Sequence, residues 1–148
     1  MRPAPPRRTL PPMIHTIEID TDGPGLLDVS DRLAALIPAG DGLATLLVRH
    51  TSCSLLIQEN ADPDVRRDLS QWAARAVPRA DDPSMRWLRH IAEGPDDMPA
   101  HIRAAILPVS LSIPFRDGRL MLGRWQGVYL WEHRDRPRRR QVAVHLGP

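Results

Sequence analysis

At 148 residues, the chain has the length of one domain, and a chain of this size buries enough surface to fold without a disulfide or a structural metal. All 20 basic residues are arginine, and the absence of lysine excludes a Schiff-base lysine, a pyridoxal-phosphate anchor and a P-loop lysine. The formal net charge of +2 gives no indication of nucleic-acid binding, and no apolar run approaches the ~20 residues of a membrane span.

The chain opens with a segment that we expect to be disordered. Residues 1–12 contain five prolines and three arginines and show neither apolar periodicity nor the apolar core of a secretory signal. Residues 13–148 are expected to form a single domain. Its only cysteine, Cys53, cannot form an internal disulfide, which is typical of a reducing compartment, and we therefore expect a cytoplasmic protein.

The first half of the domain is expected to combine strands with two helices. In chain order, the pattern predicts a strand over residues 13–20, a helix capped by Asp28 or Ser30 and stopped at residues 38–40, buried strands over 43–50 and 53–58, and a helix over 62–77. The last of these has the clearest start, because Asp62 is a suitable cap and Pro63 a suitable first helical residue.

The second half is expected to be rich in strands. After a polar stretch over residues 84–99, the pattern predicts a helix over 100–107 and strands over 109–114, 119–122, 127–133 and 141–146. Asp117-Gly118 is a strong hairpin signal between the first two of these strands. Strands and helices follow no regular βαβ order, so we predict an α+β fold, either a layered one or a mixed β-sheet barrel, rather than a Rossmann sheet.

Three histidines are candidate metal ligands. His50 ends a buried strand, and His90 and His101 flank a loop that contains acidic residues. Neutral imidazoles suit zinc, with magnesium as the alternative, and catalytic zinc keeps three protein ligands and an open position. His50, His90 and His101 are therefore predicted to hold a divalent metal. The alternative is that each histidine makes a local hydrogen bond or is exposed.

The carboxylates include one candidate catalytic residue on a strand. Glu132 continues the apolar strand face of Val128 and Leu130, so it requires a cation, an arginine or a metal as partner. A structural salt bridge with an arginine is an equal alternative to a catalytic role. Asp96 and Asp97 are expected to cap the next helix or to remain solvated.

Three further features have two interpretations each. Cys53 follows His50 by three residues, an odd separation that points the two side chains of a strand to opposite faces, so we expect a core cysteine rather than a catalytic pair. Residues 134–140 carry five arginines without interleaved aromatics, which favours a solvated turn over a phosphate-binding patch. Trp125, beside Gly127, is expected in the core, with the floor of a ligand pocket as the alternative.

Several motifs together resemble one known family. HTS and ENADPDV lie within residues 49–69, PAHI lies within 93–106, and GRWQG lies within 110–137. In this combination they resemble the YjbQ family, whose members are often described as secondary thiamine-phosphate synthases. The resemblance covers about half of the residues directly.

The resemblance implies a mixed-sheet barrel with packed helices, a homotrimer, and a polar pocket where a divalent metal could bind. His50 matches the histidine of HTS, His101 that of PAHI, and Glu132 the acid after the WQG strand, while His90 lies where many relatives have histidine and His133 where others have an aromatic residue. The site residues predicted on all these grounds are His50, His90 and His101 for the metal, Glu132 and Glu59 for catalysis, and Arg49, Ser52, Asn60, Arg124 and Trp125 for ligand binding.

The reaction that the resemblance implies joins hydroxymethylpyrimidine diphosphate to thiazole phosphate and expels diphosphate. Arg49, Arg124 and Arg134 lie beside the candidate site and are suited to phosphate groups. Two alternatives remain. One is a metal-dependent hydrolase of a small phosphorylated or acylated metabolite, with Glu132 or Glu59 as base. The other is a non-catalytic trimer that binds a small ligand. Neither a membrane nor a nucleic acid is an expected partner.

Overall fold

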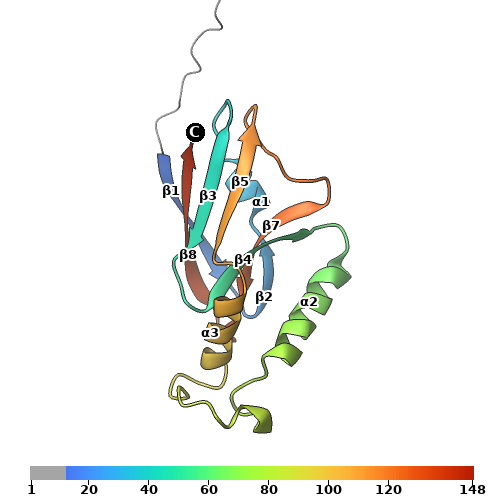
Figure 1. Cartoon of the computed structure of the whole chain (residues 1–148), viewed down its shortest axis with the longest axis vertical. Coiled ribbons are helices and arrows are strands. Elements are labelled where there is room, and N and C mark those ends of the chain that lie inside the picture. Colours follow the sequence, from blue (N-terminus) through green and yellow to red (C-terminus); the bar gives the residue numbers. More distant parts are fainter. Residues whose placement is uncertain (1–12) are drawn as a thin grey trace, which may run out of the picture.

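Two antiparallel sheets curl around one apolar core to form a half barrel (Figure 1). The structure is a computed structural model, and it describes residues 13–148, so the prediction for residues 1–12 lies outside the described residues. The larger sheet has the order β1-β8-β3-β5-β6, formed by Met13–Thr21, Arg138–Gly147, Gly42–Val48, Ser110–Arg116 and Arg119–Leu120. The smaller sheet has the order β2-β7-β4, formed by Gly25–Asp28, Gln126–Glu132 and Cys53–Glu59.

The helices lie mainly at one end of these sheets. They are α1 (Ser30–Ala34), α2 (Pro63–Ala76), the 3-10 turn η1 (Pro83–Met85) and α3 (Asp97–Ile106). Figure 1 shows α2 and α3 below the sheets, where α3 packs against β4 and α2 against β2. None of the helices in residues 13–148 is long and apolar enough to cross a membrane.

The core is built from the inward faces of both sheets. Alternate residues of β3 and β8 are buried, so each strand contributes one apolar face, as the period of two requires. The largest fully buried aliphatic side chains are Leu33, Leu46, Leu55, Leu130 and Leu146. Each such leucine stabilises the fold by roughly 1.5–3 kcal/mol relative to an exposed one.

The α+β class is confirmed, and so are most of the predicted elements. Asp62 caps α2 by accepting a hydrogen bond from the backbone amide of Asp64, and Pro63 is its first residue. The Asp117-Gly118 hairpin is also confirmed, because both residues adopt the positive φ angles, 50° and 76°, that a two-residue turn of this kind requires.

Three features differ from the sequence-based expectation. The strand pairs described within residues 13–148 all run antiparallel, so strand direction is not mixed. The strand Gly25–Asp28 was not predicted, because four residues after a turn carry too little periodicity to be recognised. Helix α3 begins at Asp97 rather than at Ala100, so His101 lies one full turn inside the helix.

Candidate metal centre

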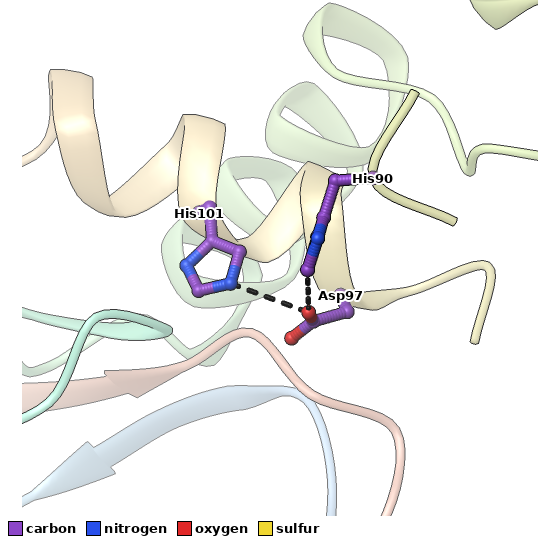
Figure 2. Close-up of side chains that lie close together, drawn as sticks. All are labelled: His90, Asp97 and His101. Carbon is purple, nitrogen blue, oxygen red and sulfur yellow. Dashed lines mark hydrogen bonds and ion pairs between the residues drawn. The ribbon is translucent and has the colours of Figure 1, made fainter. Parts of the chain in front are cut away.

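Three side chains converge at the start of α3 (Figure 2). Asp97 and His101 are four positions apart in α3 and so share one helical face. His90 reaches them from the loop that precedes the helix. The Nε2 atoms of His90 and His101 lie 2.7 Å and 3.3 Å from the same oxygen, Oδ2 of Asp97. One ligand atom from each of the three residues lies within 4.8 Å of the other two, which is the convergence that a metal ion requires.

Asp97 is the buried anion of this cluster. Its side chain is only 6% exposed, and the Arg134 guanidinium donates to its other oxygen, Oδ1, which leaves Oδ2 for the histidines. Burial raises the pKa of the Asp97 carboxyl, but the hydrogen bond with His90 and the charges of Arg134 and His101 outweigh it and hold the pKa below its usual range. Asp97 is therefore ionised at neutral pH, as a metal ligand must be.

The orientation of His101 supports a cation at this position. Its Nδ1 lies 2.9 Å from the carbonyl oxygen of Thr51, and because a carbonyl only accepts, Nδ1 carries the proton. In the neutral ring, Nε2 then presents a lone pair to the Asp97 carboxylate, an arrangement that requires a proton or a cation between them. Ring nitrogens that donate to a backbone carbonyl are typical of metal-binding histidines, since this bond fixes the tautomer.

The donor set determines which metal suits the cluster. Two imidazoles and one carboxylate form the ligand set of several catalytic zinc sites and of some iron sites, and they leave coordination positions open. Magnesium prefers oxygen ligands in octahedral geometry. The residues thus fit zinc better than magnesium.

A pocket of about 320 Å³ adjoins the cluster and shares His101 with it. The other residues that line the pocket are Val48, His50, Thr51, Ala104, Ala105 and Val109. The Nε2 of His50 accepts a hydrogen bond of 2.8 Å from the backbone amide of Gln141, so Nδ1 carries its proton. Burial and the charges of Arg140 and Arg49 lower the pKa of His50 against the opposing effect of Glu132, which keeps the ring neutral.

A family model described as "UPF0047 protein YjbQ-like" matches residues 15–147 of this chain. The chain belongs to the YjbQ/UPF0047 family. Among its relatives, the UPF0047 protein sll1880 of Synechocystis sp. is 50% identical over 131 residues, which cover 86% of each protein. The YjbQ protein of Salmonella typhimurium is 44% identical over 121 residues, which cover 82% of this chain and 78% of the relative.

Solved structures support the same conclusion for the fold. The conserved hypothetical protein TT1486 from Thermus thermophilus matches with a TM-score of 0.79 and 38% identity, over 89% of this chain and 98% of that chain. The names of these relatives state no activity, so the similarity establishes the YjbQ family and its fold.

In this YjbQ-family chain, two of the three predicted metal histidines converge, and the third residue of the cluster is Asp97 rather than His50. His90 and His101 meet at Asp97, whereas His50 lines the adjoining pocket with Nε2 already engaged. The sequence indicated Asp97 only as a helix cap or a solvated residue. Its spacing of four residues from His101 is the signal that could have identified it, since this spacing places two ligands on one helical face.

Glu132 occupies a structural position rather than the wall of the pocket beside the metal cluster. It is fully buried and accepts hydrogen bonds from Arg140, from the Thr21 hydroxyl and from the backbone amides of His133 and Arg134. The pair with Arg140 is the structural salt bridge that was the alternative to a catalytic role for Glu132. Burial raises the pKa of the Glu132 carboxyl, but the hydrogen bonds and the Arg140 charge outweigh it and lower the pKa, so Glu132 is a poor base at neutral pH.

The same ion pair corrects two other predictions. Ser52, predicted to bind a ligand, is buried, and its hydroxyl accepts from Arg140 at 3.0 Å. The arginine run of residues 134–140 is not simply a solvated turn, because its last three residues belong to β8. Strand alternation turns Arg140 into the core, where Glu132 balances its charge, while Arg139 stays exposed.

The remaining predicted residues gather at the other end of β4 and β7. Asn60 takes no part in the metal cluster and instead hydrogen bonds to the backbone of residues 125 and 126, beside Glu59. Arg124 stacks 5.1 Å from the centre of the Trp125 ring, which is exposed rather than packed in the core. The six residue steps of β4 span about 20 Å, and His101 of the cluster contacts Thr51, which precedes the opposite end of this strand. Of the predicted ligand-binding residues, Arg49 lies next to the pocket, since it precedes His50 and is exposed.

Proposed function

We propose that this YjbQ-family protein holds zinc through His90, Asp97 and His101 and hydrolyses a small phosphorylated or acylated metabolite in the adjoining pocket. The observation that carries the proposal is the convergence of both Nε2 atoms on Oδ2 of Asp97, with the His101 tautomer fixed by Thr51. This ligand set fits zinc and leaves positions for water and substrate.

The protein residues around the metal have separable roles in this proposal. Bound zinc would supply Lewis acidity, which polarises a phosphoryl or carbonyl oxygen and acidifies water. The Nδ1–H of His50 donates a hydrogen bond to the substrate, and Val48, Ala104 and Val109 limit the access of water. In the reaction, the oxygen of water bonds to phosphorus or to the acyl carbon, the bond to the leaving oxygen breaks, and that oxygen takes up a proton.

The synthase reaction implied by the family resemblance remains a second proposal with less geometric support. Diphosphate chemistry generally uses magnesium bound by carboxylate oxygens. In the pocket and cluster as described for residues 13–148, Asp97 is the one carboxylate, and Arg134 already occupies one of its oxygens. We therefore place hydrolysis first. The proposed compartment is the cytoplasm, in keeping with the free, buried Cys53.

Zinc-dependent turnover is the expected result for the purified protein. Removal of metal with a chelator should abolish hydrolysis of p-nitrophenyl phosphate or p-nitrophenyl acetate, and stoichiometric zinc should restore it. Magnesium should not restore it, because the ligand set suits it poorly. A protein that binds zinc but shows no turnover with either substrate class would favour the ligand-binding alternative. Release of diphosphate from the two thiamine precursors in the presence of magnesium would favour the synthase.

We also propose that the protein assembles as a homotrimer, in line with the family resemblance. Exposed apolar side chains on β1 and β3, among them Ile14 and Leu47, give a surface that contact between subunits would cover. Light scattering at micromolar concentration should give about three times the chain mass of 16.6 kDa. A monomer under these conditions would contradict the trimer and leave the metal centre unaffected, because one chain provides all three ligands.

A further inference from the structure

A second cavity lies on the opposite side of α3 from the metal centre. Its volume is about 200 Å³, and it is lined by residues of α2, of α3 and of the end of β7. On α3, Pro99 and Arg103 face this cavity, whereas His101 and Ala105 face the metal pocket. The two cavities share no lining residue.

His133 lines this cavity and carries a buried polar atom that has no partner in the described residues. The side chain lies in its wall and is only 2% exposed. Its Nε2 lies 2.8 Å from the Ser54 hydroxyl, but its buried Nδ1 has no hydrogen-bond partner among residues 13–148. A buried polar atom without a partner is destabilising, so its position in a cavity wall points to a ligand that completes it.

Arg103 presents a second such atom together with a charge. One of its terminal nitrogens donates to the carbonyl oxygen of Val77 at 2.7 Å, while its buried Nε–H has no acceptor among the described residues. Within residues 13–148, no carboxylate lies within ion-pair distance of Arg103. Burial disfavours the charged form and lowers the pKa of Arg103, although arginine remains protonated at any physiological pH.

The other charged residues of the cavity all take part in ion pairs, one of which is shared, because Arg134 also pairs with Asp97. Three carboxylates line it, and each is held by an arginine: Asp96 by Arg134 at 2.8 Å, Asp135 by Arg79 at 2.6 Å, and Glu132 by Arg140 at 2.7 Å. Arg103 is therefore the charged residue of the described lining without an ion pair, although the negative charge of Asp135 acts on it at longer range. An ordered water would satisfy hydrogen bonds there but would leave Arg103 without an ion pair.

We infer that this cavity is a binding site for a small oxyanion, a carboxylate or a phosphate, held by the Nε–H of Arg103 and the Nδ1–H of His133. The volume is below that of pockets for drug-sized ligands, which begin at about 300 Å³, and it is equivalent to roughly six waters, so it suits a small ion or the anionic end of a larger molecule. Charge-assisted bonds from arginine are the usual means of holding such groups.

The state of His133 agrees with this role. Burial and the nearby charge of Arg103 lower the pKa of His133 to about 4, so the ring is neutral at pH 7. The proposed site places the proton of the neutral ring on Nδ1, with Nε2 accepting from the Ser54 hydroxyl 2.8 Å away, so that Nδ1–H and the Nε–H of Arg103 are both donors. The inference does not depend on the metal, because none of the metal ligands lines this cavity.

Calorimetric titration of the full chain with sodium acetate, phosphate or sulfate, against chloride at equal ionic strength, tests the inference. At least one oxyanion should bind in a saturable manner, and Arg103→Gln should weaken that binding by about tenfold or more. Arg75→Gln is the matched control, because Arg75 is an exposed arginine of α2 outside the cavity, and it should bind like the unmodified chain. Tighter binding of acetate would identify a carboxylate as the natural group, whereas tighter binding of phosphate would identify a phosphate.

A second variant covers the case in which Arg103→Gln does not fold. His133→Phe approximately keeps the volume of the side chain and removes the Nδ1 donor, so it should lower the affinity for the same anion several-fold. The Nε–H resonance of Arg103, followed by NMR, should shift on titration and saturate with the calorimetric curve. The inference is overturned if none of the oxyanions binds more tightly than chloride, or if a folded Arg103→Gln or His133→Phe variant keeps the affinity of the unmodified chain.

Discussion

Replacing Asp97 by asparagine is expected to lower the affinity for zinc by more than about 100-fold. Loss of a residue that only supports a metal ligand lowers affinity by up to about 100-fold, and loss of the ligand itself should lower it further. The substitution keeps the size of the side chain but removes the charge that faces both histidines. Zinc titration by calorimetry at pH 7, on chains freed of metal, measures the change.

Two neighbouring variants make this test specific. Asp96→Asn removes an adjacent carboxylate that also pairs with Arg134 but lies outside the convergent cluster, so zinc affinity should change less than tenfold. His50→Ala should likewise have a small effect on affinity and a larger one on turnover, because His50 lines the pocket. Near-normal zinc binding by Asp97→Asn combined with a large loss in His50→Ala would instead favour the three-histidine site predicted from the sequence.

Replacing Glu132 by glutamine is expected to reduce the free energy of unfolding by about 3–5 kcal/mol, because it leaves Arg140 buried without a counterion. The side chains of both residues are almost completely buried, at 0% and 5% exposure, so solvent cannot compensate. Chemical denaturation measures the change. Asp20→Asn, which breaks the exposed pair with Arg139, is the matched control and should have far less effect.

The pH dependence of stability follows from the same carboxylate. The pKa of Glu132 is lowered in the folded chain, so its contribution is fully present above the unfolded value of about 4.3 and is lost as the pH falls through the lower folded value. Between pH 5 and pH 3, the unmodified chain should therefore lose more stability than Glu132→Gln. If the free energies of unfolding of the two proteins fall in parallel over this pH range, Glu132 is not the group that titrates.

Local chemistry was sufficient to predict several features of the fold. The cap at Asp62 and the Asp117-Gly118 turn depend on neighbouring residues alone, and both are found where expected. The short strand Gly25–Asp28 exists because β7 pairs with it, an interaction between residues about a hundred positions apart that local periodicity does not contain.

The candidate site was also predictable only where its geometry depends on residues close together in the sequence. His90 and His101 flank one loop, so their convergence follows from local chain geometry. The position of His50 depends on a hydrogen bond with Gln141 in another strand, and the Glu132–Arg140 pair depends on how β7 leads into β8. Glu59 and Asn60 match the family motif but lie at the far end of β4, because a motif specifies order along the chain rather than distance in space.

The position of bound zinc distinguishes the His90–Asp97–His101 cluster from the three-histidine site. Crystals of the zinc-loaded protein, measured at the zinc absorption edge, should show one anomalous peak about 2.0–2.2 Å from Nε2 of His90, Nε2 of His101 and Oδ2 of Asp97. A peak coordinated by His50 in place of Asp97, or no ordered zinc at these three residues, would rule out zinc binding by the His90–Asp97–His101 cluster.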